Sequence, residues 1–430
     1  MSERAITIAP VTSVFDRLVG QQAVVDELSA AARSAVGASA ALDDSDGGVE
    51  SMFGDAVPAP RNSMTHAWLF TGPPGSGRSV AAQCFAAALQ CEIATGLPGS
   101  EVGCGRCHAC ATVMAGTHGD VRRIVPEGLT ISVKLIRETV QIASRRPGVG
   151  RWQIVLIEDA DRLTEQAANA LLKVVEEPPS RTVILLCAPS VDPEDISVTL
   201  RSRCRHVPLT MPGVDSIAAV LIGDGIDAER ARWAASVSGG HVGRARRLAT
   251  DESARSERNQ ALGLARAATN ESTAYGAAEA LVKTAENSAK AISAVLDEAE
   301  TEEMRTALGA GGTGKGAGGA MRGTAGFLKD MERQQKSRRT RLQRDVLDRA
   351  LVDLAALFRD AVVASYAAPV AAMHPDHSEQ TLRMAGFASP EKLLRCVEAV
   401  LACREALDVN VKPKFAVDAM VADVATALRR

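Results

Sequence analysis

The sequence predicts an α/β domain with a parallel sheet in its first half and all-α structure after it. Residues 153–157 and 183–187 are largely continuous apolar runs, as expected of strands buried on both faces of a parallel sheet. Residues 164–177 between them have the pattern of a helix, and a glycine-rich turn follows a short apolar strand at residues 68–70. Strand signals fade after Pro212, so the doubly wound part is expected to end near residue 210.

The amino-acid composition limits the classes of function that this protein can have. The 430 residues suffice for two or three domains, and an aromatic content of 3% predicts an aliphatic, helix-rich core. A net charge of -3 argues against strong non-specific binding to nucleic acid. The apolar runs are too short to cross a bilayer and the first residues lack a signal-peptide layout, so we expect a cytoplasmic protein with no membrane partner.

The first elements can be taken in order. Residues 11–35 predict an extended stretch followed by a helix, and residues 39–63, rich in Ala, Asp, Gly and Pro, predict a mobile surface loop. Residues 79–89 predict a helix whose inner side carries small apolar residues. In the helix at 164–177, Thr164 is the expected N-cap and the pair Pro178-Pro179 forces the end.

The second half predicts helices. Residues 215–250 form a small helical unit, and residues 253–428 are mostly helical around a glycine-rich loop at 309–326. Phe327 is expected to start a long amphipathic helix. Four of its apolar residues recur at three- and four-residue spacing on one face: Val346, Ala350, Leu354 and Leu357.

A candidate phosphate-binding loop lies between the first strand and its helix. Its residues are Gly72, Pro73, Pro74, Gly75, Ser76, Gly77, Arg78 and Ser79, in the position of a Walker A loop. Backbone N–H groups and the positive end of a helix can hold a polyphosphate there, and Ser79 fits the magnesium-binding hydroxyl. Arg78 replaces the lysine of the pattern, and its planar group cannot deliver the same compact ammonium. An ordinary glycine-rich turn is the alternative, which the acidic strand downstream disfavours.

That acidic strand ends in Glu158 and Asp159, where a Walker B strand has Asp to hold magnesium and then Glu to orient water. Here the order is reversed, so each carboxylate is misplaced by one methylene. Phosphoryl transfer depends on placement, and an error of about 1 Å can cost roughly a hundredfold. We therefore expect ATP and magnesium to bind weakly or not at all; the alternative interpretation is a solvated acidic strand end.

Four cysteines predict a metal site. Cys91, Cys104, Cys107 and Cys110 have the spacing C-x12-C-x2-C-x2-C, and four thiolates give the tetrahedral shell typical of structural zinc. Gly103 and Gly105 ease the turn between them, and His108 is a rival fourth ligand. An iron–sulfur cluster is the alternative metal, while unligated thiols would leave three cysteines within seven residues unexplained. Five other cysteines are expected to be packed thiols: Cys84, Cys187, Cys204, Cys396 and Cys403.

Three fragments together resemble the AAA+ clamp-loader subunits of bacterial DNA polymerase III. They are F-D-R-L-V-G-Q at residues 15–21, N-A-L-L-K with E-E-P-P at residues 169–179, and Ser202-Arg203-Cys204. The resemblance is specific over about residues 11–207. It implies an AAA+ P-loop domain at 1–210 with a zinc module at 91–110, a helical lid at 211–250 and a helical collar at 251–430. It also implies that Val19 and Gly20 lie against the adenine of a nucleotide.

The residues that differ from the family pattern indicate which type of clamp-loader subunit this chain resembles. Arg78, Glu158 and Asp159 depart from the working nucleotide site, and Arg244 stands one place late for the lid arginine of a G-x-x-R motif. Beside an intact S-R-C arginine, these losses resemble the delta-prime type. The resemblance implies a rigid scaffold with little hydrolysis of its own, in which Arg203 acts in trans as an arginine finger.

That resemblance implies the partners. They are ATPase subunits of gamma/tau type and a delta-type subunit in a hetero-pentamer, the sliding clamp, and primer-template DNA reached through the assembled complex. Two other functions remain open: an ATP-hydrolysing gamma/tau-type subunit, and a zinc-bearing DNA-binding module.

A basic run precedes or lies on the long C-terminal helix. Its members are Arg333, Lys336, Arg338, Arg339, Arg341 and Arg344. A solvated helix face with Glu332, Asp345 and Asp348 nearby is the favoured interpretation, and a nucleic-acid patch is the alternative. No aromatic residues suited to stacking on bases are interleaved.

Overall fold

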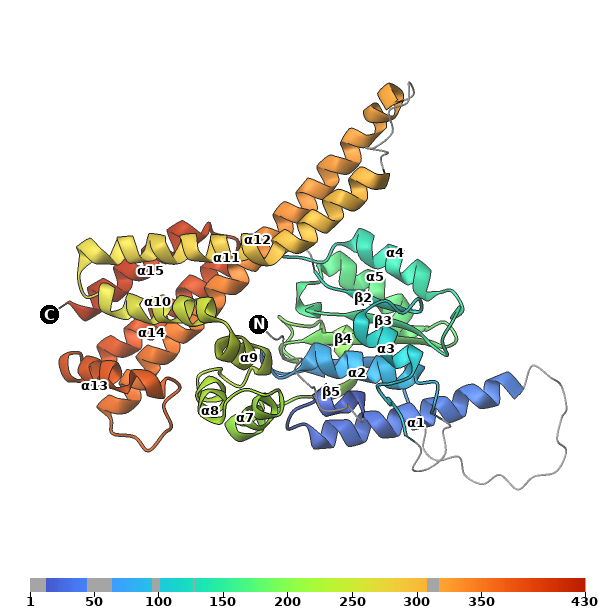
Figure 1. Cartoon of the computed structure of the whole chain (residues 1–430), viewed down its shortest axis with the longest axis horizontal. Coiled ribbons are helices and arrows are strands. Elements are labelled where there is room, and N and C mark those ends of the chain that lie inside the picture. The colour runs from blue at the N-terminus through green and yellow to red at the C-terminus, as the bar shows by residue number, and fades with distance from the viewer. Residues whose placement is uncertain (1–12, 45–63, 95–100, 127, 308–316, 430) are drawn as a thin grey trace, which may run out of the picture. The chain divides into compact units, whose positions relative to one another are not determined.

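The computed structural model describes residues 13–44, 64–94, 101–126, 128–307 and 317–429, and it divides into two compact units (Figure 1). The first unit comprises the described residues up to 126 together with residues 130–249. The second comprises residues 250–430 and a short piece at 127–129, of which residues 128 and 129 are described.

A parallel sheet organises the first unit. Its five strands run in the order β2-β3-β4-β1-β5. Their bounds are β1 (Ala67–Thr71), β2 (Val121–Ile124), β3 (Gln153–Ile157), β4 (Thr182–Ala188) and β5 (Arg205–Pro208). Every residue of β1, β3 and β4 is buried, which confirms the three strands predicted from continuous apolar runs. The edge strands β2 and β5 expose arginine and histidine side chains and were not predicted.

Helices cover both faces of this sheet, giving three layers (Figure 1). The helices of this part are α1 (Gln22–Asp44), α2 (Arg78–Gln90), α3 (His108–Ala115), α4 (Val133–Ala143), α5 (Glu165–Glu176) and α6 (Val198–Arg201), with 3-10 turns η1 (Val14–Arg17) and η2 (Ala160–Arg162). Trp68 and Phe70 of β1 point into the core shared with α1 and α2. Ala67 and Leu69 point into the core shared with α4 and α5. The alternation follows from the two-residue period of a strand. The α/β fold with a parallel sheet that the sequence predicts is confirmed.

Local signals set the bounds of α5 as predicted. The Thr164 hydroxyl accepts a hydrogen bond from the Ala167 amide at 3.3 Å, and the helix ends at Glu176, ahead of the two prolines. Three further helices follow the sheet in the first unit: α7 (Val214–Gly223), α8 (Ala228–Ser236) and α9 (Val242–Thr250). The predicted division into core, lid and collar at residues 210 and 250 stays a prediction.

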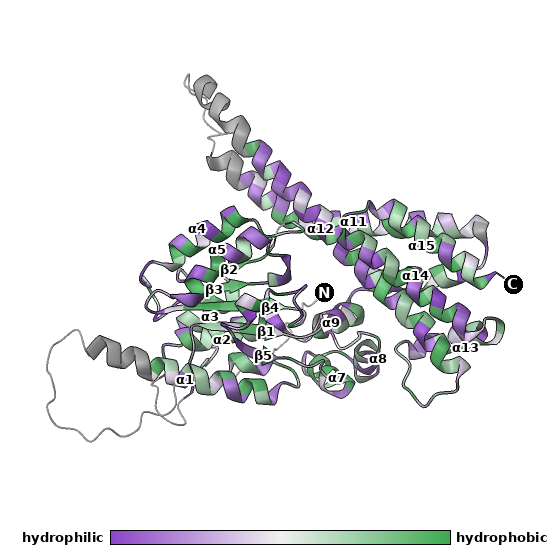
Figure 2. Ribbon diagram, turned by 180° about the vertical axis from the view of Figure 1, so that it is seen from behind, coloured by the Kyte–Doolittle hydropathy of each residue, from purple (hydrophilic) through white to green (hydrophobic). Residues whose placement is uncertain are grey.

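The second unit is helical. Its elements are α10 (Glu252–Ala267), α11 (Glu271–Ala307), α12 (Ala317–Ser365), η3 (Pro375–His377), α13 (Ser378–Phe387), α14 (Pro390–Asp408) and α15 (Pro413–Leu428). Val346, Leu354 and Leu357 are buried in its core and Ala350 packs against it, as their spacing predicts. Figure 2 shows mainly hydrophilic residues along the described part of the α11–α12 hairpin. None of the helices in the described residues is long and apolar enough for a bilayer crossing.

Two loop predictions are wrong in part. Residues 39–44 belong to α1, and residues 317–326 belong to α12, which begins ten residues before the predicted Phe327. Extending an existing helix costs much less than nucleating one, so alanine-rich flanks join the neighbouring helix despite their glycines. Residues 45–63 and 308–316 lie outside the described residues.

Candidate functional site

The phosphate-binding loop joins β1 to α2. Gly75 and Gly77 have φ angles of 96° and 91°, a left-handed conformation that glycine adopts without strain. Gly77 is the residue before α2, and because glycine has no side chain it does not cap the first amides of this helix. The loop therefore has the backbone of an anion site at a helix N-terminus.

Two segments hold the loop from either side. The Gln21 amide group donates to the Thr210 carbonyl at 2.5 Å and to the Ser76 carbonyl at 3.5 Å. On the other side, a Cβ added to Gly75 would lie 2.7 Å from the Cβ of His241, just before α9. The loop is thus packed between the N-terminal part of the chain and the predicted lid. The Arg244 amide donates to His241 Nδ1 at 3.2 Å, so the late lid arginine lies within the first turn of α9.

Two of the residues that depart from the Walker patterns have local features that the sequence does not predict. Glu158 forms an ion pair with Arg123 of the edge strand β2. Asp159 has a left-handed backbone with φ of 50°. Within the described residues, Nη1 of Arg78 and Oγ of Ser76 are buried without a hydrogen-bond partner. The carboxylate at the predicted metal position is thus paired with a side chain of the same chain.

The four predicted cysteine ligands converge. Their sulfur atoms all lie within 4.8 Å of one another. Cys91 directly follows α2, Cys104 and Cys107 lie on the following loop, and Cys110 is in the first turn of α3. Gly103 and Gly105 have φ angles of 68° and 70°, which confirms that they form the turns between ligands. Residues 95–100 lie outside the described residues.

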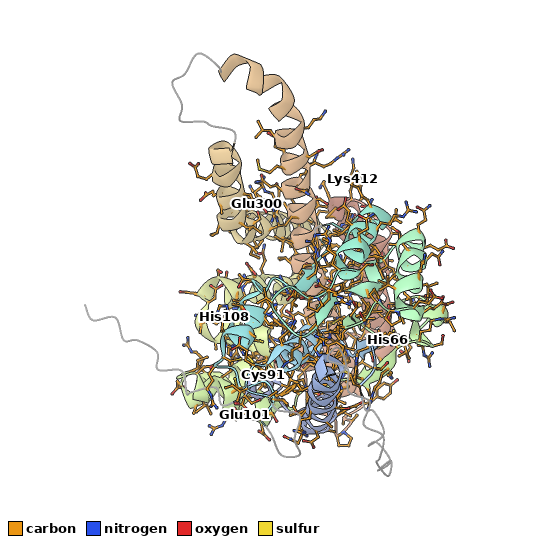
Figure 3. All side chains as sticks on the ribbon, turned by 90° about the vertical axis from the view of Figure 1, so that its right-hand side faces the viewer. His66, Cys91, Glu101, His108, Glu300 and Lys412 are labelled. Carbon is orange, nitrogen blue, oxygen red and sulfur yellow. The ribbon has the colours of Figure 1, made fainter. Side chains whose placement is uncertain are left out.

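This cluster fits a tetrahedral metal ion. Zinc–sulfur bonds of about 2.3 Å place tetrahedral sulfurs about 3.8 Å apart, so a small inward shift would complete the shell. The amides of Cys107 and Cys110 donate to Cys104 Sγ and Cys107 Sγ at 3.3 and 3.4 Å, and such bonds stabilise thiolates. The Cys110 thiol beside Cys91 lowers the pKa of Cys91. His108 is exposed and is not part of the cluster (Figure 3).

The remaining cysteines behave as packed thiols. Cys84, Cys187, Cys396 and Cys403 are buried and Cys204 is partly buried. Burial raises the pKa of the thiols of Cys84, Cys204, Cys396 and Cys403 to about 12. They are therefore poor metal ligands and poor nucleophiles at neutral pH.

Arg203 lies between α6 and β5, with its side chain 39% exposed. Its Nε is 2.7 Å from a carboxylate oxygen of Glu176, and its Nη1 donates to the Thr199 carbonyl at 3.0 Å. No local pattern in the sequence predicts the Glu176 contact. It brings together two of the three fragments on which the family resemblance rests.

The basic run on α12 is largely paired within the second unit. Arg338 donates to Glu300 at 2.8 Å and Arg339 to Asp297 at 2.9 Å, both on α11. Arg344 donates to the Leu407 carbonyl at 2.8 Å. Asp297 is buried, so Arg338 and Arg339 stabilise the packing of α12 against α11. The predicted solvated helix face is thus right only in part, because Arg338 and Arg339 pair with carboxylates of α11, whereas Arg341 pairs with the predicted Asp345.

Residues 57–212 match a family model described as DNA polymerase III, delta subunit. DNA polymerase III subunit delta' of Pseudomonas aeruginosa is 37% identical over 155 residues, which are 36% of this chain and 45% of that protein.

Residues 57–212 are thus similar to subunits of DNA polymerase III clamp loaders. The chain is also similar to the DNA polymerase III subunit tau/gamma of Haemophilus influenzae, 35% identical over 33% of this chain and 20% of that protein. The chain thus spans less than half the length of these curated relatives. Among solved structures, a gamma subunit-related protein of Thermotoga maritima aligns over 84% of this chain and 94% of that one, at 16% identity and a TM-score of 0.36.

Proposed function

We propose that this chain is the delta-prime-type subunit of a DNA polymerase III clamp loader. It would act with ATPase subunits of gamma/tau type and a delta-type subunit in a hetero-pentamer. That complex would place a sliding clamp on primer-template DNA in the cytoplasm, with this chain as a scaffold that hydrolyses little or no ATP.

The observation that carries the choice of subunit type is the state of the nucleotide site. A working site needs a carboxylate that holds magnesium and a lysine that reaches the phosphates. Glu158 is instead paired with Arg123, and Arg78 stands in place of the lysine. Val19, Gly20 and residues 72–79 remain proposed nucleotide contacts, because the loop backbone keeps its anion-binding conformation.

A second observation supports a role toward a neighbouring subunit. Arg203 is partly exposed and held by an exposed carboxylate rather than by a buried one, so its guanidinium can leave Glu176 at small cost. A planar guanidinium suits the charge that spreads over a transferring phosphoryl group. We therefore assign Arg203 as the arginine finger of the adjoining ATP site.

Four sulfurs within 4.8 Å of one another support zinc as the metal of the cysteine module. Thiolate-only tetrahedral sites favour zinc or an iron–sulfur cluster, and a closed set with no open position is structural. Zinc bound there would hold the connection between α2 and α3 in place. Metal analysis of the native protein decides between the two metals.

Co-purification tests the proposal. The ATPase and delta-type subunits are expressed with and without this chain, and a complex with one copy of it is the expected product. Purified alone, the chain should turn over ATP far more slowly than a working ATPase subunit. Turnover at the rate of such a subunit would instead favour a gamma/tau-type enzyme, to which the similarity with tau/gamma subunits also extends.

A further inference from the structure

The cysteine module touches the segment that leads into the first domain. The amide of Val14 donates to the Gly103 carbonyl at 2.7 Å, and the Ser13 hydroxyl donates to the same oxygen at 3.3 Å. Val14 is 1% exposed, and a Cβ added to Gly103 would stand 2.6 Å from its Cγ2. Gly103 precedes the ligand Cys104, so the position of this carbonyl depends on the ligand beside it.

The same segment continues to the phosphate-binding loop. Residues 13–21, here called the N-terminal segment, run through η1 to Gln21, which is 5% exposed. The Gln21 side-chain nitrogen donates to the carbonyls of Ser76 and Thr210, and its Oε1 accepts from the Thr210 amide at 3.4 Å. A continuous chain of contacts therefore joins the cysteine module to the loop.

A further contact anchors the segment from α2. The Cys84 thiol donates to the Val14 carbonyl at 3.0 Å, so both backbone polar groups of Val14 are bonded. Of the two partners, Cys84 lies within a helix that the sheet supports, whereas Gly103 lies on the ligand-bearing loop. Only the second bond depends on how that loop is held.

We propose that metal binding by the four cysteines positions the N-terminal segment, and through Gln21 the phosphate-binding loop. A bound ion would hold Cys104 against Cys91 and Cys110 and so fix the direction of the Gly103 carbonyl. Without the ion, that loop opens more readily, and the segment loses one backbone hydrogen bond and the packing of Val14. Gly103 is thus a positioning residue. The inference uses the metal assignment and is independent of the clamp-loader role.

Hydrogen exchange measures this coupling directly. The native protein is compared with protein stripped of metal by a chelator under reducing conditions. Exchange in residues 13–21 should become roughly five- to tenfold faster, the size expected for losing about one net hydrogen bond. Residues 72–79 should follow with a smaller increase. The helices α14 and α15 should not change, and adding zinc back should restore protection.

Two glycine substitutions separate coupling from backbone strain. Gly103 and Gly116 both have left-handed backbones, with φ of 68° and 76°, and both lie in or beside the module. A Cβ at Gly116 would meet nothing within 4 Å. Gly103→Ala should therefore raise exchange in residues 13–21 while the metal stays bound, and Gly116→Ala should leave those residues unchanged.

If Gly103→Ala fails to bind metal, Val14→Ala tests the same contact from the side of the N-terminal segment. This change leaves the module intact, should keep the metal content, and should raise exchange in residues 13–21. Stripping metal from Val14→Ala should then add less than it adds in the native protein, because the two changes remove the same interaction. Three results would overturn the proposal: no metal in the native protein, unchanged exchange after stripping, or equal loss of protection throughout the first unit.

Discussion

The ion pair between Arg203 and Glu176 controls how readily the proposed finger is available. The two side chains are 39% and 44% exposed, and their charged atoms are 2.7 Å apart. Exposed pairs of this kind are worth about 0.2–1 kcal/mol, and salt screens them further. To reach a phosphate on a neighbouring subunit, Arg203 must give up this pair.

Glu176→Gln should therefore increase ATP turnover by the assembled complex. At about 1.4 kcal/mol for a factor of ten, the lost pair corresponds to an increase of roughly 1.4- to 5-fold at the site that Arg203 serves. Raising the ionic strength should shrink the difference, because it weakens the same pair. The assay is steady-state turnover by the reconstituted complex with clamp and primed DNA.

Glu177→Gln is the matched control. Glu177 is also exposed, and its substitution removes the same charge one residue further on, but the carboxylate that pairs with Arg203 is that of Glu176. It should leave turnover unchanged. If Glu176→Gln instead lowers turnover as far as Arg203→Ala does, Glu176 holds the finger in its working position and the competition argument is wrong.

Three further predictions follow from the geometry. The isolated chain should show negligible ATP turnover, and the combined changes Arg78→Lys, Glu158→Asp and Asp159→Glu should raise it only if the lid arginine is dispensable; fast turnover by the unmodified chain would refute the reading of the site. Cys107→Ala should lower the metal content below the expected one ion per chain and expose residues 91–110 to protease, and unchanged metal content would count against the four-thiolate site. Burial lowers the pKa of His374; the nearby Arg258 lowers it further, whereas Asp353 and Asp360 raise it. The folded protein therefore favours the neutral imidazole, and the free energy of unfolding should fall as the pH drops below about 6.5. A nitrogen of Arg258 lies 2.9 Å from His374 Nδ1, and Arg258 also pairs with Asp376. The loss of unfolding free energy, measured by chemical denaturation, should be at most about 1.4 kcal/mol per pH unit. If His374→Asn shows the same pH dependence of stability, this prediction is wrong.

The sequence predicted the parts of the fold that local pattern controls. β3 needed only a continuous apolar run, and α5 only a threonine cap and a proline stop. The edge strands β2 and β5 were missed because they are four residues long, with polar side chains facing solvent, and exist through pairing with β3 and β1. Their partners are distant in sequence, so no local pattern marks them.

The candidate sites divide in the same way. Thiolate spacing alone predicted the cysteine cluster, because three of the ligands share one short loop and helix turn. The pairings of Glu158 with Arg123 and of Glu176 with Arg203 were not predictable. Each joins residues at least 27 positions apart, and each depends on the three-dimensional arrangement of strands and helices around the sheet. Both pairings involve residues on which the proposed function depends.

Clamp loading by a complex carrying Arg203→Ala tests the central claim most directly. The neighbouring Arg201→Ala is the control, because the Arg201 side chain donates to the Val191 carbonyl at 3.4 Å and not to Glu176. The variant complex should assemble, and turnover at the adjoining ATP site should fall by about 10³ or more, leaving only that of the other sites. Clamp loading should fall with it, Arg203→Lys should rescue little, and Arg201→Ala should load normally. An Arg203→Ala complex that assembles and loads clamps at the unmodified rate would contradict the account.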